Sequence, residues 1–334
     1  MSPAWIGRGA GDGNRTRIAS LEGWNSAIEL HPQKDTSLAT AILAAVEIGF
    51  RLVDVFTEVP FAGNQLCVVP VPPADLDAAT MAMLAQEIGF SETAFVTGIR
   101  PGGYDIRIFT PNDELPFAGH PTLGTAFALV SEGRLSASAV QSSAAGDVPV
   151  DVDLDRGTAW MQQLPPVFGE PVMDRQGVAR AAGLEPSDLI DGLPIVAVSV
   201  GIPHLMVPVR DEAVLRRAAR DDAGCSAVCA STGAESLYLF TVRADGDVLA
   251  RMFDRWLAIG EDPATGSAAG PLGAYLAAHG LAGLPGRVTI AQGEMVDRPS
   301  FLLVEARPGG DPFTVRVGGG VRIVGEGSFR IDAT

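Results

Sequence analysis

The sequence predicts an α+β protein of two similar domains, each with strands around one central apolar helix and with a cleft between them. Two observations carry this prediction. The phrase Glu-x-Pro-x-x-Gly occurs twice, beginning at Glu114 and at Glu261, and an apolar stretch of helical length follows each copy. Segments with strand-like alternation flank both copies. Self-similarity at so long a spacing indicates a duplicated domain, because solenoid repeats are much shorter.

Further matches occur in the same order along the chain. Leu66 and its neighbours resemble the stretch around Leu205, and the Ser-Glu-Thr around Glu92 resembles the Ala-Glu-Ser around Glu235. We therefore expect these residues to be counterparts in the two domains. We also expect the two glycine-led helix starts to meet at the domain interface.

The first domain is predicted to span residues 49–165. Alternating or β-rich composition predicts strands at 51–57, 65–71, 91–97 and 104–109. Apolar residues at helical spacing predict a helix at 75–89, and the small apolar residues of 120–129 predict a buried one. Strands follow to about residue 164, where Pro165-Pro166 marks the boundary.

The second domain is predicted to span residues 166–334 and to repeat this order. Strands are expected at 195–200, 205–209, 235–242 and 248–253. Helices are expected at 211–220 and, again buried, at 267–279. The last strand of the chain is expected to return to the first domain.

Residues 1–48 differ from the rest of the chain. The stretch 7–17 is rich in glycine and arginine and has no apolar period. Such a segment cannot bury enough apolar surface to order itself. We expect a disordered extension, or sequence that is not part of the native protein.

Composition limits the classes of partner. The chain has 334 residues, enough for two domains, and a formal charge of −16. That charge argues against nucleic acid and anionic membranes as partners. The most apolar run, 193–209, is broken by two prolines and a histidine, so no membrane span is expected. Three cysteines do not make a disulfide framework, and we expect a cytoplasmic protein.

The two predicted helix starts suggest an anion site. Gly119 and Gly266 each precede an apolar helix, and glycine lets the backbone approach a ligand closely. Free N–H groups at a helix start bind carboxylate or phosphate well. The plain alternative is two ordinary capped helices, with Ser267 as the cap. Duplication favours the anion site.

Four ionisable residues accompany these helix starts, namely His120, Glu114, Asp262 and Glu261, and Glu92 is a further candidate from outside the repeated phrase. His120 follows Gly119 directly, and the alternative for it is a structural histidine. Asp262 precedes a proline, so it is alternatively a turn residue. Glu92 lies in the apolar setting Phe-Ser-Glu-Thr-Ala-Phe, where burial would raise its pKa and suit it to proton transfer. The alternative for Glu92 is an exposed glutamate at a strand end.

Signatures of metal and nucleotide sites do not occur in the sequence. It has no His-Glu-x-x-His, no Cys/His cluster, no Walker motif and no Gly-x-Gly-x-x-Gly after a strand. Ser267 is not in a Gly-x-Ser-x-Gly nucleophile elbow. The remaining groups are carboxylates, imidazole and helix ends. They suit proton transfer next to an anionic group, with no cofactor and no metal.

Four motifs resemble those of the phenazine biosynthesis PhzF-like isomerases: Phe-Ala-Gly-Asn at 61–64, Ser-Glu-Thr at 91–93, Phe-Thr-Pro-x-x-Glu-Leu-Pro-Phe-Ala-Gly-His-Pro-Thr at 109–122, and Glu-Asp-Pro-Ala-Thr-Gly-Ser-Ala at 261–268. The resemblance runs from about residue 51 to the C-terminus. It implies the diaminopimelate epimerase-like fold, with two β-barrel domains around central helices, no cofactor, and a homodimer.

The resemblance also implies roles for individual residues. Glu92 would be the acid/base that moves a proton, with His120, Asp262 and Ser267 lining the site. Asn64 would add a polar contact. The sequence departs from the family at Gln65, where proline is usual after the Gly-Asn turn, and this departure bears on the substrate.

We therefore expect a cofactor-independent isomerase that moves a proton between carbons of a small carboxylate-bearing substrate. One alternative is a two-base epimerase or racemase of an amino acid. Related racemases use a cysteine at each helix start, and Ala118 and Thr265 stand there in this chain. The other alternative is a non-catalytic binder of a small metabolite on the same fold.

Overall fold

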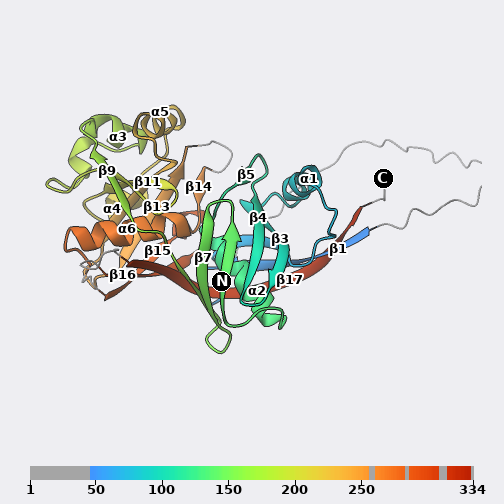
Figure 1. The fold of residues 1–334 in the computed structure, drawn as a ribbon. Helices are drawn as coiled ribbons and strands as arrows, with labels where there is room; N and C mark the ends of the chain where they lie inside the picture. Colours follow the sequence, from blue (N-terminus) through green and yellow to red (C-terminus); the bar gives the residue numbers. More distant parts are fainter. Residues whose placement is uncertain (1–45, 256–259, 283–285, 308–313, 332–334) are drawn as a thin grey trace, which may run out of the picture. The chain divides into compact units, whose positions relative to one another are not determined.

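The computed structural model describes residues 46–255, 260–282, 286–307 and 314–331 (Figure 1). The first strand, β1 (Val46–Val55), begins three residues before residue 49, where the first domain is expected to start. Val46 pairs with Ile331 of the last strand and Ile48 is buried. The rest of the expected extension lies outside the described residues.

The protein is a mixed α+β protein, and its described residues form one hydrogen-bonded sheet of 17 strands. The N-terminal strands after β1 are β2 (Asn64–Val69), β3 (Glu92–Arg100), β4 (Gly103–Phe109), β5 (Glu114–Leu115), β6 (Ser138–Ser143), β7 (Gly146–Asp153) and β8 (Thr158–Gln162). The C-terminal strands are β9 (Val167–Pro171), β10 (Val196–Ser199), β11 (Pro203–Pro208), β12 (Ser236–Val242), β13 (Val248–Asp254), β14 (Glu261–Asp262), β15 (Gly286–Gln292), β16 (Ser300–Arg307) and β17 (Thr314–Ile331).

The strand pairing of β2 to β6 recurs in β11 to β15. In the first set, β2 runs parallel to β3, β3 antiparallel to β4, β4 antiparallel to β5 and parallel to β6. In the second set, β11 to β15 take the same pairings in the same order. We call β2–β6 with their helix the N-terminal set, and β11–β15 with theirs the C-terminal set.

Each set holds one buried helix of 13 residues. In α2 (Gly119–Ser131) every residue except the last is buried, and strands β1, β2, β3, β7, β8 and β17 contact it. The counterpart α6 (Gly266–Ala278) contacts β10, β11, β16 and β17. A helix that is apolar on all faces is stable in water only when it is enclosed in this way.

Short helices cover the outer faces. They are α1 (Ala78–Ile88), α3 (Arg175–Ala181), α4 (Glu212–Arg217) and α5 (Asp222–Thr232), with 3₁₀ turns at Pro186–Asp188 and Glu294–Val296. In α1, Asp77 accepts a hydrogen bond from the Thr80 N–H, and Gly89 ends the helix at φ 69°. The helix predicted at 75–89 is therefore too long mainly at its N-terminal end, since α1 begins only after its N-cap Asp77. Helices α3 and α5 were not predicted from sequence.

The strand β17 contacts the central helices of both sets, α2 and α6. It pairs with β16 at one end, with β8 in the middle and with β1 along the rest of its length (Figure 1). Where it crosses, a Cβ on Gly318 would lie 2.3 Å from the Trp160 ring, and one on Gly320 would lie 2.3 Å from the Thr57 carbonyl oxygen. Glycine is required there because the chains pass too closely for a side chain.

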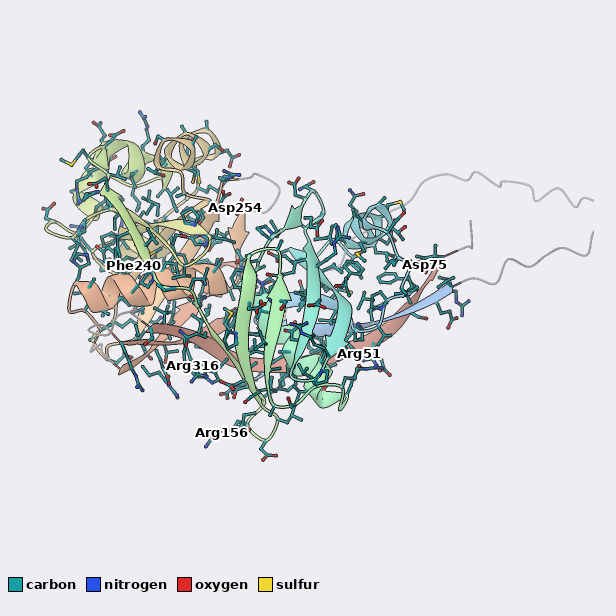
Figure 2. All side chains as sticks on the ribbon, in the orientation of Figure 1. Arg51, Asp75, Arg156, Phe240, Asp254 and Arg316 are labelled. Atoms are coloured by element: carbon teal, nitrogen blue, oxygen red, sulfur yellow. The ribbon has the colours of Figure 1, made fainter. Side chains whose placement is uncertain are left out.

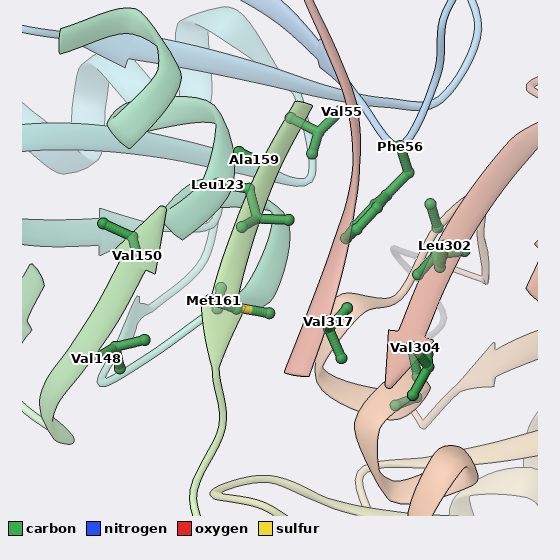
Figure 3. Close-up of a cluster of buried hydrophobic side chains, with 14 of the residues drawn as sticks. Val55, Phe56, Leu123, Val148, Val150, Ala159, Met161, Leu302, Val304 and Val317 are labelled. Carbon is green, nitrogen blue, oxygen red and sulfur yellow. The ribbon is translucent and has the colours of Figure 1, made fainter. Parts of the chain in front are cut away.

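One apolar core runs through both sets. Figure 3 shows part of it, with Leu123 of α2, Val317 of β17 and Leu302 of β16 among the buried side chains. Separate buried clusters lie under α1 and under α3 to α5. The shared core fixes the helix starts of α2 and α6 against each other, which positions the site.

The strand register corrects the expected sequence repeat. Phe109 pairs with Glu114 in the N-terminal set, and Phe253 pairs with Glu261 in the C-terminal set. These two phenylalanines are therefore counterparts. They supply a fixed point from which the neighbouring strands can be compared.

Counting from that point, Glu92 corresponds to Ser236. Thr93 pairs with Phe109, and Leu237 pairs with Phe253. The residue before each is Glu92 in one set and Ser236 in the other. The expected match between Glu92 and Glu235 is thus wrong by one residue, and a slip of one moves a side chain to the opposite face of a strand.

The expected match between β2 and β11 is also displaced by one residue. Leu66 pairs with Glu92, and His204 pairs with Ser236. His204 therefore takes the position of Leu66, and the expected match of Leu66 with Leu205 is wrong. The consequence is chemical, because His204 faces the same side as Ser236 and the start of α6.

Candidate active site

A cavity of about 810 Å³ lies between the two sets. Both helix starts line it, together with side chains from the ends of β3, β11, β13 and β14. Those with functional groups include Glu92, His120, His204, Asp262 and Ser267. Apolar side chains such as Leu115, Ile202 and Met252 complete the wall. Asp254, labelled in Figure 2, lies at the end of β13 and also lines the cavity.

The starts of α2 and α6 are in backbone contact. A Cβ on Gly119 would lie 2.8 Å from the carbonyl carbon of Gly266 and 2.9 Å from the Ser267 nitrogen. A Cβ on Gly266 would lie 2.9 Å from the Phe56 ring. Both glycines are needed because no side chain fits between the helices. The expected meeting of the helix starts is present.

Neither helix start is capped by a side chain. The N-cap residues are Ala118 and Thr265, and neither makes a side-chain cap hydrogen bond. The alternative of Ser267 as a cap is therefore wrong. The first two N–H groups of α2 and of α6 therefore donate to no cap side chain, and the positive ends of two helix dipoles point toward one cavity.

Glu92 begins β3, with its side chain turned inward beside Leu66 and α2. The side chain is 15% exposed. Burial raises the pKa of Glu92 from 4.5 to about 7, the Ser91 hydrogen bond lowers it, and the Asp254 charge raises it further. The alternative of an exposed strand-end glutamate is wrong. Near neutral pH this carboxyl group can both accept and release a proton.

His120 faces Glu92 as a neutral imidazole. Burial lowers its pKa to about 4, against the raising effects of Asp262 and of a hydrogen bond to the Gln65 backbone. Its Nε2 lies 3.3 Å from Glu92 Oε2 and forms no aligned hydrogen bond with it. Nδ1 is then the nitrogen bonded to Gln65, and Nε2 presents a lone pair to Glu92. The two groups are neighbours without being an ion pair.

Asp262 is held by groups from both sets. Asn64 Nδ2 donates to Asp262 Oδ1 at 2.8 Å and to the Ala264 carbonyl at 2.9 Å. The Thr265 hydroxyl donates to Asp262 Oδ2 at 2.5 Å. Burial and the Glu92 charge raise the pKa of Asp262 to about 6, although His120 and these hydrogen bonds lower it. Asn64 is therefore behind the cavity wall, bonded to Asp262, and is not itself part of the lining.

Gln292 supports this corner and was not singled out from sequence. Its side-chain amide donates to the Asp262 carbonyl at 2.8 Å and to the Thr265 hydroxyl at 2.9 Å, and Tyr238 donates to its oxygen. All these groups are buried. No local pattern could have identified Gln292, because its partners come from β12 and from the β14–α6 turn.

His204 is the second histidine of the site, and its role was missed. Its Nδ1 lies 2.8 Å from the Ser236 hydroxyl, and its Nε2 lies 3.1 Å from the Ser267 hydroxyl. Burial lowers the pKa of His204 to about 3, so the ring is neutral. The correct strand register would have been the signal, because it puts His204 on the inner face.

The two repeated glutamates are structural partners of arginine. Glu114 binds Arg107 through both oxygens, and Glu261 binds Arg251 in the same way. The pairs occupy equivalent positions, but the first is half-exposed and the second is buried. They hold the two short strands β5 and β14 beside the cavity.

The cavity has no cysteine in its lining, and the three cysteines, all buried, lie elsewhere. Across the described residues, no group of three or more His, Cys, Asp or Glu side chains is arranged to hold a metal ion. Within the same residues, no helix is both long and apolar enough to cross a membrane. The functional groups at the two helix starts are the side chains of Glu92, His120, Asp262, His204 and Ser267.

Comparison with known proteins agrees with this geometry. The profile of the phenazine biosynthesis-like protein family, PhzC–PhzF, matches residues 53–327. The chain belongs to this family. It is 33% identical over 290 residues to an uncharacterized isomerase of Clostridium acetobutylicum, covering 81% of this chain and 94% of that relative. It is an isomerase of the PhzF-like family.

Two further relatives define the family context. The chain is 32% identical over 290 residues to the trans-2,3-dihydro-3-hydroxyanthranilate isomerase of Pseudomonas chlororaphis, covering 84% of this chain and 98% of that enzyme. The crystal structure of a Bacillus anthracis phenazine biosynthesis protein of the PhzF family superposes with a TM-score of 0.77 at 27% identity, covering 85% and 99% of the two chains. The PhzF-like fold of the described residues is therefore that of the family.

Proposed function

We propose that this PhzF-like protein is a cofactor-independent isomerase in which Glu92 moves a proton between two carbons of a small carboxylate-bearing substrate. The observation that carries the proposal is the pair of groups at the N-terminal helix start. Glu92 is largely buried, with a pKa raised to about 7, and lies beside a histidine whose pKa is lowered to about 4. A carboxyl group poised near neutral pH suits both halves of a proton shuttle.

The steps follow from the positions of the groups. The Glu92 carboxylate takes a proton from a C–H bond of the substrate, so that an O–H bond forms and the C–H electron pair delocalises. The protonated Glu92 then returns the proton to a second carbon of the same delocalised system. No oxidant or reductant is needed, because the C–H electron pair stays in the substrate and the Glu92 carboxylate is regenerated by the second transfer. While Glu92 carries the proton, that proton can exchange with solvent.

His120 and Asp262 are proposed to assist without titrating in the cycle. Neutral His120 presents its Nε2 lone pair to Glu92, which favours the protonated carboxyl group between the two transfers. Asp262 would accept a hydrogen bond from a polar substituent of the substrate. The N–H groups at Gly119 and Gly266, with the Ser267 hydroxyl, would bind the substrate carboxylate.

The charge of the cavity wall narrows the substrate class. Among the described residues, carboxyl groups line it at Glu92, Asp113, Glu235 and Asp262, against one guanidinium at Arg255, which is paired with Glu235, and Glu114 lines it as the partner of Arg107. A simple dianion would be repelled by such a wall. A carboxylate that also carries an amino group fits better. The substrate of the Pseudomonas chlororaphis relative is of this class, which makes it the first compound to test.

The repeated pairing of β2–β6 and β11–β15 supports the further proposal that the two sets are duplicated domains, each a barrel around its helix. The domain limits at 49–165 and 166–334 and the homodimer remain predictions. Light scattering on the purified protein would measure the oligomeric state directly.

The test of the proposed function is solvent deuterium incorporation. The wild-type protein in D₂O is incubated with trans-2,3-dihydro-3-hydroxyanthranilate and with a panel of cyclic amino-carboxylates, and products are followed by NMR. We expect isomerisation with deuterium at the newly protonated carbon. Glu92→Gln should lower the rate by a factor of about a thousand, within the range for a lost general acid/base.

Glu87→Gln is the matched control, because Glu87 is exposed on α1 and away from the cavity. It should react as the wild type does. Persistent exchange in Glu92→Gln would show that another group moves the proton. Exchange with inversion at one stereocentre would assign an epimerase instead, and binding without exchange would assign a metabolite binder.

A further inference from the structure

The ring of His204 connects the buried hydroxyl group of Ser236 with the partly buried hydroxyl group of Ser267. It lies on β11 with 2% of its surface exposed, between Ser236 on β12 and Ser267 in the first turn of α6. A neutral imidazole has one N–H donor and one acceptor nitrogen. Its two neighbours are hydroxyls, which can each donate or accept. The direction of the chain of hydrogen bonds therefore depends on which nitrogen carries the proton.

The surroundings of Ser236 favour one direction. Ser236 is completely buried, and the hydrogen bond recorded for its hydroxyl among the described residues is the one to His204 Nδ1. A buried hydroxyl proton needs an acceptor. If Ser236 donates to Nδ1, the ring proton is on Nε2, and His204 donates to the Ser267 oxygen. In the opposite direction the Ser236 proton would have no acceptor among the described residues.

We propose that His204 is a positioning residue for the anion site, a role that rests on the proposed function. Its Nε2–H donates to Ser267 Oγ, so the Ser267 hydroxyl proton points into the cavity. There it joins the free N–H groups of α6 and donates to the substrate carboxylate. His204 itself does not touch the reacting carbons.

The equivalent positions of the N-terminal set show why this arrangement is specific. There Leu66 stands in place of His204, Glu92 in place of Ser236, and His120 in place of Ser267. One set thus carries the proton-transfer pair. In the other set the same backbone positions carry a Ser–His–Ser chain, which can orient a donor but has no group that titrates near neutral pH.

The test reads the His204 ring directly. Two-dimensional NMR of the ¹⁵N-histidine-labelled full-length protein reports the protonation of both ring nitrogens, with assignment by His204→Gln. At pH 7 we expect His204 to be neutral with the proton on Nε2. Ser236→Ala should abolish that preference, while Ser231→Ala, at an exposed serine of α5, should leave the spectrum unchanged. A proton on Nδ1 in the wild type, or a doubly protonated ring, would overturn the proposal.

A kinetic readout separates positioning from structural support. With a substrate that the exchange assay identifies, Ser236→Ala should raise KM about fivefold or more and leave kcat within about twofold, as for lost uniform binding of the substrate. A fall in kcat at constant KM would contradict the proposal. Absence of turnover by the wild type with every compound would count against the proposed function and would leave the NMR result for His204 intact.

Discussion

The start of α2 and the start of α6 share one backbone arrangement and differ in chemistry. Both begin with a glycine, both lack a side-chain cap, and both face one cavity. Next to α2 stand Glu92 and His120, a carboxyl group near neutral pKa and a neutral imidazole. Next to α6 stand Ser236 and Ser267, joined through His204. Under the proposed function, both helix starts contribute to one anion site, while proton transfer belongs to the α2 side alone.

The largest expected difference between the sets lies in their two arginine–glutamate pairs. Glu261→Gln should lower the free energy of unfolding by about 3 kcal/mol, because Arg251 is buried and would lose its charge partner. Glu114→Gln should cost less than about 1 kcal/mol, because that pair is half-exposed. Urea unfolding of both variants at pH 7 measures this. Equal losses would mean that the two pairs are not distinguished by burial.

The next effect is a change in stability when Glu92, the proposed proton-transfer group, is replaced by glutamine. The folded-state pKa of Glu92 is raised from 4.5 to about 7, so the folded protein binds more protons than the unfolded chain between these values. Its contribution to stability is present below pH 4.5 and is lost as the pH rises through 7. The glutamine of the Glu92→Gln variant does not titrate. The free energy of unfolding of this variant, relative to that of the wild type, should therefore rise by on the order of 2 kcal/mol between pH 4.5 and pH 8.

Urea unfolding as a function of pH checks the sign of this effect. Glu87→Gln, at an exposed glutamate, should follow the wild-type curve throughout. A Glu92→Gln variant whose stability runs parallel to wild type across the range would show that the Glu92 carboxyl group has an ordinary pKa. The proposed shuttle would then lose its basis.

The sequence predicted only part of the difference between the starts of α2 and α6. Helix starts and the motif around Glu92 were found because glycine placement and apolar runs are local signals. The expected correspondence between the strands was wrong by one residue, because alternating apolar residues look alike when shifted. The offset is revealed only by the pairing of Phe109 with Glu114 and of Phe253 with Glu261. His204 was hidden for that reason. Gln292 was hidden because all its partners are distant in sequence.

The smallest effect tests the contact between the helix starts. Gly119→Ala should destabilise the protein by about 1–2 kcal/mol, since the new Cβ would lie 2.8 Å from the Gly266 carbonyl carbon and would push the helices apart. Gly49→Ala is the matched control, because no atom lies within 4 Å of its Cβ position. Thermal unfolding should show a lower Tm for the first variant and an unchanged or higher Tm for the second. Equal Tm values would mean that the helix starts are not in contact.

The central claim is that only the α2 side transfers the proton, whereas the α6 side contributes to binding the anion and not to the proton transfer. Steady-state kinetics of Glu92→Gln and Ser267→Ala, measured side by side on one substrate, test it most directly. We predict that Glu92→Gln loses kcat by about a thousandfold with little change in KM, and that Ser267→Ala raises KM about tenfold with kcat within about threefold of wild type. A kcat loss of the same size in both variants would contradict the division of duties between the two helix starts.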